Sequence, residues 1–104
     1  MRRGEVWWAD LPPPAGRRPV LLLSRDRAYE VRASVTVAIL TRTVRGIPTE
    51  VALGPEDGMP AACAVNTDDI VTIPKSLLRE QITLLSPGKM AAVASAVSFA
   101  LDLP

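Results

Sequence analysis

The stretch "SVTVAILT", residues 34–41, decides the fold that this sequence predicts. It is rich in β-branched residues and apolar toward its end, which makes it the clearest strand in the chain. Shorter segments of the same kind flank it and are bounded by turn residues. We expect further strands at residues 5–11, 19–24, 49–53 and 81–86, and either two short strands or one bent strand over 62–66 and 69–74.

Three segments connect these strands. Three successive prolines, residues 12–14, precede Ala15 and Gly16, and such a run cannot join a β-ladder. We expect residues 26–32 to be polar and irregular, and residues 75–79 to form a short helical turn. The sequence therefore predicts mostly antiparallel strands joined by short loops, a pattern typical of a small barrel.

The end of the chain predicts a helix instead of a strand. Ser86 followed by Pro87 is a helix-start signal, with Ser as N-cap and Pro at the first helical position. Apolar residues then recur at steps of three, four and four, which places them on one helical face. This face should pack on the sheet through Met90, Val93, Val97 and Leu101.

Length and composition limit the possible functions. A chain of 104 residues suits one domain, residues 1–104, and is long enough to bury a core without a disulfide or a metal. Cys63 is the only cysteine and there is no histidine, so neither an internal disulfide nor a His/Cys metal site nor a histidine-based triad can form. The lone cysteine fits the cytoplasm. We expect no membrane segment, because no apolar run approaches about 18 residues.

Charge is distributed unevenly along the chain. The net charge is only +1, but residues 1–45 hold nine arginines against four acids, a balance of +5, and residues 46–104 hold three basic and seven acidic residues, a balance of −4. Every basic residue of the first part is arginine, whose planar fork suits phosphate better than the point charge of lysine does. A genome that favours arginine codons would give the same composition.

Six segments resemble, in this order and spacing, the MazF/PemK/Kid-type toxins of toxin–antitoxin pairs, and among them the compact mycobacterial members. The segments are "RRGEVWWADL", "GRRPVLLLSRD", "VTVAILT", "RGIPTEVAL", "VNTDDIVTIPKSLL" and "ITLLSPGKM". The resemblance implies a mainly β (α+β) fold, a small SH3-like antiparallel β-barrel with a C-terminal helix, as in MazF, PemK and CcdB. It also implies a cytoplasmic homodimer that cuts single-stranded RNA, with mRNA as the expected target, at short sequence motifs and without a metal or cofactor. Attack by the 2′-OH would leave 2′,3′-cyclic phosphate and 5′-OH ends, and the cleavage would inhibit translation and growth.

The motif matches carry three catalytic roles over to this chain. Arg18, directly before Pro19, matches the essential arginine of the family's RPV motif and would clamp the phosphate; proton donation is a less favoured second role, because arginine holds its proton tightly. Thr49 matches a threonine of the "PT" strand start, whose hydroxyl would bind a phosphoryl oxygen or position the 2′-OH. Asp68 falls where relatives carry an acid. Its carboxylate would orient the 2′-OH, act as base or read a base edge. The alternative is that Asp68 only ends a strand through an Asx-turn.

Further residues are candidates for RNA and partner contacts. Arg17 would contact phosphates, and Asn66, Arg25 and Arg45 are additional RNA-binding candidates. Trp7 and Trp8 are neighbours and must face opposite sides of a strand, so one should enter the core and the other should serve an interface or stack on a base. In this family the dimer surface also accepts the C-terminal segment of a MazE-like antitoxin.

The first loop departs from the family pattern. Many relatives have a longer loop with acidic or histidine residues, whereas this chain has only "PPPAG". The groups that transfer protons are therefore not assigned by the motifs. Two alternatives stay open: a barrel of this fold that binds nucleic acid or protein without catalysis, and a gyrase poison resembling CcdB, which the absence of a C-terminal tryptophan disfavours.

Overall fold

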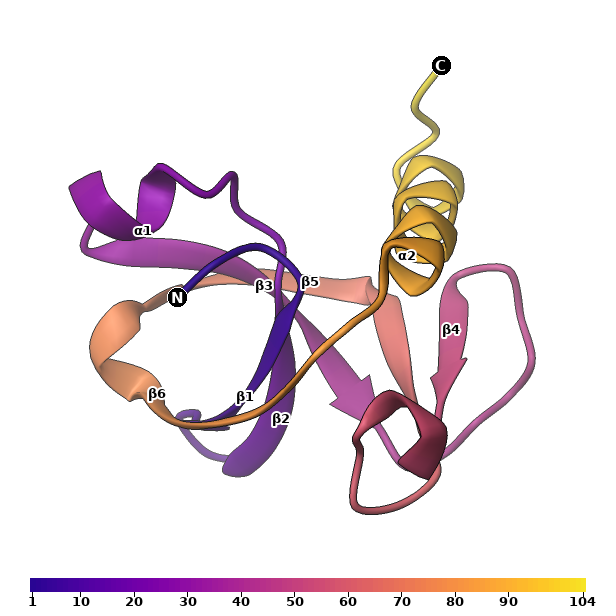
Figure 1. Ribbon diagram of the computed structural model, residues 1–104, viewed down its shortest axis with the longest axis horizontal. Helices are drawn as coiled ribbons and strands as arrows, with labels where there is room; N and C mark the ends of the chain where they lie inside the picture. The colour runs from indigo at the N-terminus through magenta and orange to yellow at the C-terminus, as the bar shows by residue number, and fades with distance from the viewer.

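A computed structural model describes all residues from Met1 to Pro104. It contains six strands, two α-helices and two single 3₁₀ turns (Figure 1). The elements, in chain order, are β1 (Glu5–Asp10), β2 (Arg17–Leu22), α1 (Ala28–Val31), β3 (Ser34–Thr41), β4 (Glu50–Leu53), η1 (Pro55–Asp57), β5 (Cys63–Pro74), η2 (Lys75–Leu77), β6 (Leu78–Leu84) and α2 (Pro87–Ala100).

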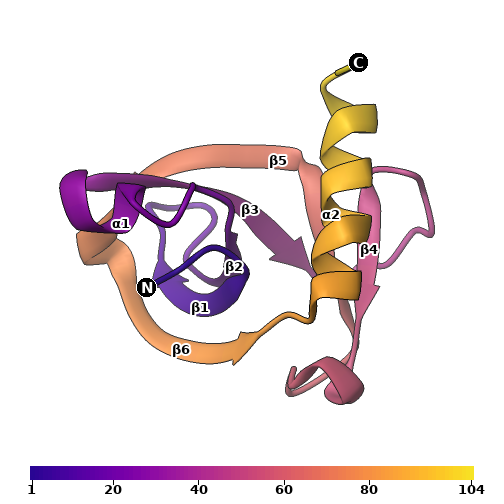
Figure 2. The ribbon, with the colours of Figure 1, turned by 45° about the horizontal axis from the view of Figure 1, so that its top comes forward.

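All six strands belong to one antiparallel sheet, in the order β4-β5-β3-β2-β1-β6. The sheet curls strongly, so that β5 and β6 pass on opposite sides of β1 and β2 (Figure 2). The two edge strands, β4 and β6, are not hydrogen-bonded to each other. The predicted class, a small antiparallel barrel with a C-terminal helix, is confirmed, as a half-open barrel.

Strand β3 lies at the centre of the packing because both of its faces are buried. Val35, Val37 and Ile39 point into a cluster enclosed by the curled sheet. Ala38 and Leu40, on the opposite face, join a second cluster that lies between the sheet and α2. Alternate residues of a strand point to opposite faces, so the one apolar stretch supplies two cores.

Helix α2 covers the outer cluster. The Ser86 side chain accepts a hydrogen bond from the Lys89 amide and caps the helix, as the sequence predicts. Val93 is fully buried, and Met90 and Val97 pack against the same cluster. The prediction for Leu101 is wrong: it follows the last helical residue and is 55% exposed. Neither α-helix has the length and hydropathy needed to traverse a lipid bilayer.

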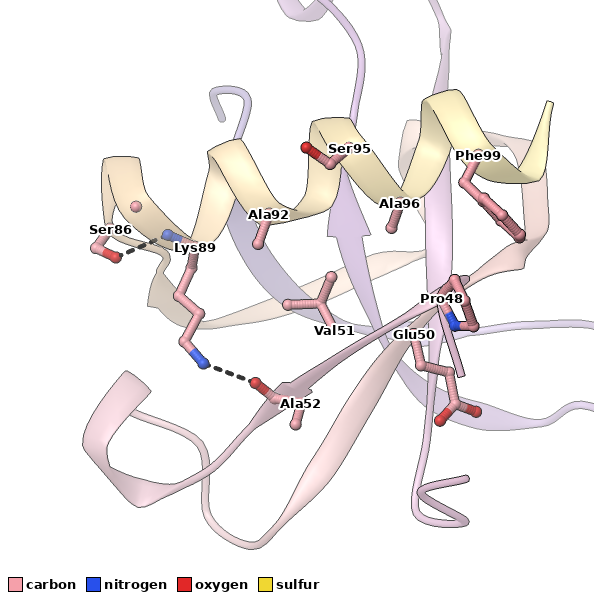
Figure 3. Close-up of a pocket in the computed structure, with 11 residues that line it drawn as sticks. Pro48, Glu50, Val51, Ala52, Ser86, Lys89, Ala92, Ser95, Ala96 and Phe99 are labelled. Atoms are coloured by element: carbon pink, nitrogen blue, oxygen red, sulfur yellow. Dashed lines mark hydrogen bonds between the residues drawn. The ribbon is translucent and has the colours of Figure 1, made fainter. Parts of the chain in front are cut away.

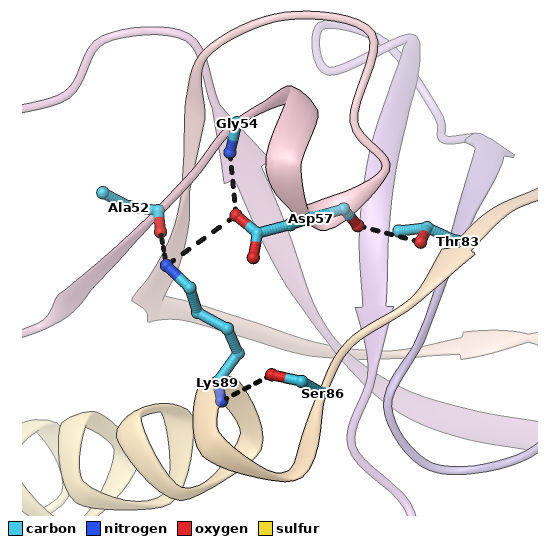
Figure 4. A network of polar contacts seen from close by, with 6 residues as sticks. All are labelled: Ala52, Gly54, Asp57, Thr83, Ser86 and Lys89. Carbon is cyan, nitrogen blue, oxygen red and sulfur yellow. Dashed lines mark hydrogen bonds and ion pairs between the residues drawn. The ribbon is translucent and has the colours of Figure 1, made fainter.

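Lys89 also ties the start of α2 to the edge of the sheet (Figure 4). Its Nζ donates to the Ala52 carbonyl at 2.8 Å and lies 3.7 Å from a carboxylate oxygen of Asp57. The same Asp57 oxygen accepts from the Gly54 amide, and the Asp57 carbonyl accepts from Thr83 Oγ1. Helix α2, η1 and the strands β4 and β6 are thus joined through one lysine and one aspartate.

Several predicted boundaries are corrected by the structure. Residues 26–32 are not irregular, because a single helical turn, α1, forms there and buries Ala28 and Tyr29. Strand β2 starts two residues earlier than predicted, because Asp10 pairs with Arg17 in the β1–β2 ladder. Strand β6 starts three residues earlier, because Leu78 pairs with Ala9. The segment over 62–74 is one bent strand, β5.

Cys63 is buried at the edge of the outer cluster. Burial raises the pKa of its thiol, and the Asp57 carboxylate raises that pKa further. The thiolate is the nucleophilic form, so this cysteine is poorly reactive in the folded chain.

We expect Leu40→Ala to lower the free energy of unfolding by about 2–5 kcal/mol, because it leaves a cavity in the outer cluster, where Leu40 is 1% exposed. Urea unfolding followed by circular dichroism measures the change. The control is Val31→Ala, at a residue that is 58% exposed, and it should change stability by less than about 0.5 kcal/mol. Equal losses in the two variants would contradict the proposed packing.

We expect the Cys63 thiol to react with a disulfide reagent at pH 8 at least about tenfold more slowly in the folded chain than in urea. The raised pKa and the burial act in the same direction, since both reduce accessible thiolate. Absorbance of the released thiol measures the rate. Similar rates in the two states would show that Cys63 is accessible.

Candidate functional site

A groove of about 540 Å³ opens where β2 begins. Its walls come from β1 and β2, from the end of β3 and from the loop that precedes β5. The groove is lined by Trp8, by Arg17, Arg18 and Pro19, by residues 40–43, and by residues 59–63. The catalytic candidate Arg18, the RNA-binding candidate Arg17 and one of the two tryptophans therefore meet in one place.

Arg18 is partly buried at this groove and held by the sheet beneath it. Its terminal Nη2 donates to the backbone carbonyl of Leu40 at 2.6 Å. Because Leu40 is anchored in the core, the guanidinium has a rigid support on the neighbouring strand. The other guanidinium donors are not engaged by any hydrogen bond or ion pair within the chain. Arg18 can therefore present donors to an anion without first losing an ion pair.

Trp8, Arg17 and Asp10 form a layered arrangement beside Arg18. The Arg17 Cζ lies 4.8 Å from the centre of the Trp8 ring, a cation–π geometry. Asp10 lies 3.8 Å from Arg17 and accepts a 2.6 Å charge-assisted hydrogen bond from Arg79 on β6. Asp10 and Arg79 are not among the site residues predicted from the sequence. The pairing of Asp10 with Arg17 across the first hairpin was a usable signal, whereas Arg79 is brought in only by the sheet.

Trp7 faces the other side of β1. Its indole Nε1 donates to Glu5 Oε1 at 2.8 Å, and its ring packs against the enclosed cluster. Glu5 is itself buried and has Arg2 at 3.9 Å. The two tryptophans thus face opposite ways, as the sequence predicts, and it is Trp8 that lines the groove.

Thr49, Asn66 and Asp68 gather at a second place, where β5 bulges. Ile39 pairs with Asn66 and the preceding Ala38 pairs with Ile70, so residues 67–69 are extra on β5 and have no partner on β3. The Asn66 side chain accepts from the Asp68 amide, which makes an Asx-turn centred on Asn66 instead of on Asp68. Asp68 is exposed.

Thr49 joins this bulge through Thr67. Its carbonyl accepts from both the amide and the hydroxyl of Thr67, at 2.9 and 2.6 Å. Its own Oγ1 is buried and has no hydrogen-bond partner. An unpaired buried hydroxyl costs about 1–3 kcal/mol and calls for an explanation. Thr49 is therefore a polar group whose bonding capacity the fold alone does not use.

The two places are close but not coincident. Strands β2 and β4 are separated by β3 and β5, so three strand spacings put their backbones roughly 14 Å apart along the sheet. The Arg18 side chain covers the first spacing, because it reaches the Leu40 carbonyl on β3. Thr49, Asn66 and Asp68 do not line the groove that contains Arg18.

Arg25 and Arg45 also lie outside this groove. Arg45 is exposed in the loop between β3 and β4, where its amide donates to Glu50. Arg25 follows the end of β2, whereas Arg18 is at its start, so the two lie at opposite ends of that strand. Arg42, which the sequence analysis did not single out, does line the groove. No group of three or more His, Cys, Asp or Glu side chains is placed to hold a metal ion.

A second and wider groove, of about 860 Å³, runs between α2 and β4 (Figure 3). Ala92, Ala96 and Phe99 contribute its helical wall, and Pro48 and Glu50 lie opposite. Phe99 is 63% exposed. This groove is mostly apolar and holds none of the candidate RNA-contact arginines.

The whole chain matches known toxins. Residues 2–101 match the model of the family described as "PemK-like, MazF-like toxin of type II toxin-antitoxin system". A probable endoribonuclease MazF2 of Mycobacterium tuberculosis is 45% identical over 91 residues, which are 86% of this chain and 87% of that protein. A probable endoribonuclease MazF5 of the same species is 39% identical over 101 residues, 96% of this chain and 92% of that protein.

Solved structures agree with these sequence relatives. A mycobacterial endoribonuclease in complex with its cognate antitoxin superposes with a TM-score of 0.89 and 35% identity, over 100% of this chain and 97% of that one. The Mycobacterium tuberculosis toxin MazF-mt6 gives a TM-score of 0.88 and 36% identity, over 96% and 98% of the two chains. The chain therefore belongs to the PemK-like, MazF-like toxins of type II toxin–antitoxin systems.

Proposed function

We propose that residues 1–104 form a single toxin domain that acts in the cytoplasm as a metal-independent endoribonuclease on single-stranded RNA. The observation that carries the proposal is Arg18, whose guanidinium is fixed to the Leu40 carbonyl at the edge of an open groove. Relatives at 37–45% identity are named endoribonucleases, which supports the same activity here.

The reaction needs charge stabilisation more than a strong nucleophile. The ribose 2′-oxygen forms a bond to the adjacent phosphorus, the bond from phosphorus to the 5′-oxygen breaks, and the products are a 2′,3′-cyclic phosphate and a 5′-OH. The 2′-OH proton leaves with a base and the departing 5′-oxygen takes up a proton. Extra negative charge develops on the phosphoryl oxygens, and the fixed donors of Arg18 stabilise it there without reorganisation.

Neighbouring groove residues would hold the flanking nucleotides. Trp8 offers an aromatic face for a base, and Arg17, which now covers that face, would move to a phosphate when a base takes its place. Asp10 limits how far Arg17 can swing, because the two are paired. Sequence-independent phosphate contacts and one stacked base are the recognition that this geometry supports.

Thr49, Asn66 and Asp68 are proposed to act on the part of the RNA that crosses from the groove to the β5 bulge. The Thr49 hydroxyl has no partner within the chain to lose, so it can bind a phosphoryl oxygen or 2′-OH once its buried side chain turns toward the surface. Asp68 is exposed, so it can reach a 2′-OH or a base edge as base, orienting group or reader. Arg45 and Asn66 are proposed as further RNA contacts.

An antitoxin is the proposed protein partner. One of the similar structures is an endoribonuclease bound to its cognate antitoxin. An acidic and partly apolar C-terminal segment of a MazE-like antitoxin would suit the groove that holds Arg17, Arg18 and Trp8, and its binding there would exclude RNA.

The chain is also proposed to form a homodimer. Large apolar side chains are exposed at the end of α2 and in the loop between β3 and β4, namely Phe99, Leu101, Leu103, Val44 and Ile47. A monomer seldom leaves so many of them open without a use. A second copy of the chain is the occupant that the resemblance implies.

We expect Arg18→Ala to lower the rate of RNA cleavage by about 10²–10³, the cost of removing one preorganised donor of this kind. The measurement is cleavage of a long unstructured RNA in EDTA, with the ends analysed for cyclic phosphate. Arg18→Lys is the matched variant: it keeps the charge but loses the fork, and we expect it to stay within about tenfold of the Ala variant.

A rate loss below about fivefold in Arg18→Ala would remove this residue from the active site. Binding of RNA by the unaltered chain without any cleavage would instead favour a non-catalytic RNA-binding barrel. Thermal unfolding of each variant separates a folding defect from a catalytic one.

We expect Phe99→Glu to shift the chain from dimer to monomer in sedimentation velocity experiments, because it places a charge in the apolar surface at the end of α2. Ser98→Glu, one residue away on a half-buried position, tests whether the effect belongs to the Phe99 side chain. An unchanged dimer in Phe99→Glu would show that another face joins the two copies.

A further inference from the structure

Eight of the nine arginines of residues 1–45 divide between two ends of the barrel, and the ninth, Arg45, lies in the loop between β3 and β4. Arg17, Arg18 and Arg42 lie at the groove, where β2 starts and β3 ends. The antiparallel ladders place the other end of β2 beside the start of β1 and the start of β3. Five arginines lie at that end: Arg2, Arg3, Arg25, Arg27 and Arg32. We refer to these five as the second basic surface.

Several contacts hold the second basic surface together. The Arg3 amide donates to Asp26 Oδ1 at 2.7 Å, and the Arg3 guanidinium donates to the Leu23 carbonyl. The N-terminal segment therefore lies against the chain that follows β2 (Figure 1). Arg27 and Arg32 stand directly before and after the single turn of α1, so their Cα atoms are roughly 8 Å apart.

The positive charge of this surface is only partly neutralised. All five arginines are exposed. The acids nearby are Glu5, Asp26 and Glu30, so five positive charges against three negative ones leave a balance of +2. Arg2 pairs with Glu5 at 3.9 Å, but Arg25, Arg27 and Arg32 have no carboxylate within 4.0 Å. The whole chain has a net charge of only +1, so this local excess is not a general property of the molecule.

Position separates this surface from the groove. Arg18 and Arg25 are seven residues apart along β2 and its continuation, which corresponds to roughly 20 Å of extended chain. No residue of the second basic surface lines the groove. A group bound in the groove therefore cannot touch both sets of arginines unless it is a long polymer.

We propose that the second basic surface is an additional RNA-binding site, which holds the phosphate backbone of the substrate strand away from the cleaved bond. The ligand of this surface would be a run of phosphodiesters, bound without base recognition, because exposed guanidinium forks bind phosphates and carry no sequence information. The inference rests on the proposed function for the identity of the substrate. Its new content is that a long RNA binds more tightly than an RNA that is only long enough to fill the groove.

The dimensions of the molecule fix the length of RNA that distinguishes the two modes. The chain extends 32 Å along its longest axis. At the stacked rise of about 3.4 Å per nucleotide, a strand needs roughly ten nucleotides to reach from one end to the other, and an extended single strand, with roughly twice that rise, needs about five. An RNA of three nucleotides can occupy only the groove, whereas one of thirty can occupy both places.

The test compares binding of these two RNAs, uniformly 2′-O-methylated so that no 2′-OH can attack. The variant is the full chain with Arg25→Gln, Arg27→Gln and Arg32→Gln together, at three exposed positions without ion pairs. We expect the Kd for the thirty-nucleotide RNA to rise about tenfold at 50 mM salt. The slope of log Kd against log salt should fall by about 2, because each of the three lost phosphate contacts contributes about 0.7 to that slope. The Kd for the three-nucleotide RNA should change less than twofold.

Two matched variants act as controls. Lysine at the same three positions keeps the charge and should retain most of the salt slope. Glu30→Gln removes an exposed acid from the same surface and should tighten binding of the long RNA. Thermal unfolding confirms that each variant folds.

An unchanged Kd for the long RNA would overturn the proposal, and so would an equal loss for both lengths. Weaker binding of poly-glutamate with unchanged binding of long RNA would overturn it in favour of an acidic protein partner. The proposed function fails separately, if the unaltered chain does not cleave unmodified RNA. Loss of long-RNA binding in the glutamine variant would then still support the second basic surface.

Discussion

The structure depends on the burial of both faces of β3. Val35, Val37 and Ile39 fill the interior of the curled sheet, while Ala38 and Leu40 meet the residues beneath α2. A strand buried on both sides cannot shift by one residue without exchanging its two faces, so its register is tightly fixed. Every strand that pairs with β3, directly or through a neighbour, inherits this register. The groove is a consequence, because its walls are the ends of strands held in this order.

Arg18 links this packing to the proposed chemistry. Its guanidinium is supported by a backbone carbonyl, which carries no formal charge, so the arginine is positioned without being neutralised. Arg17 contrasts with it, since it stacks on Trp8 and pairs with Asp10, which itself binds Arg79. Arg18 thus keeps donors free for an anion, whereas Arg17 is bound by other side chains. This division suits a site in which one guanidinium meets the reacting phosphate and the other adapts to flanking nucleotides.

The arginines also show how a nearly neutral chain can favour a polyanion. Their net effect over the whole molecule is cancelled by acids in the second half of the sequence. The fold separates them into a groove and the second basic surface, at opposite ends of β2. A short anion meets one of these places and a long strand can meet both. Length would then contribute to the choice of substrate in addition to base sequence.

The sequence by itself determined the class of fold, the capped helix after Ser86 and the opposite orientations of Trp7 and Trp8, because these depend on local periodicity and on capping chemistry. The motif around Arg18 and Pro19 was also recognisable from sequence. Only the tertiary structure decided which tryptophan lines the groove and that Asp10 and Arg79 lie beside that groove. The tertiary structure also decided that Arg25 lies at the other end of β2 and that Thr49 joins the bulge of β5. These facts depend on pairing between strands far apart in the chain and on a three-residue bulge, and local sequence preference specifies neither.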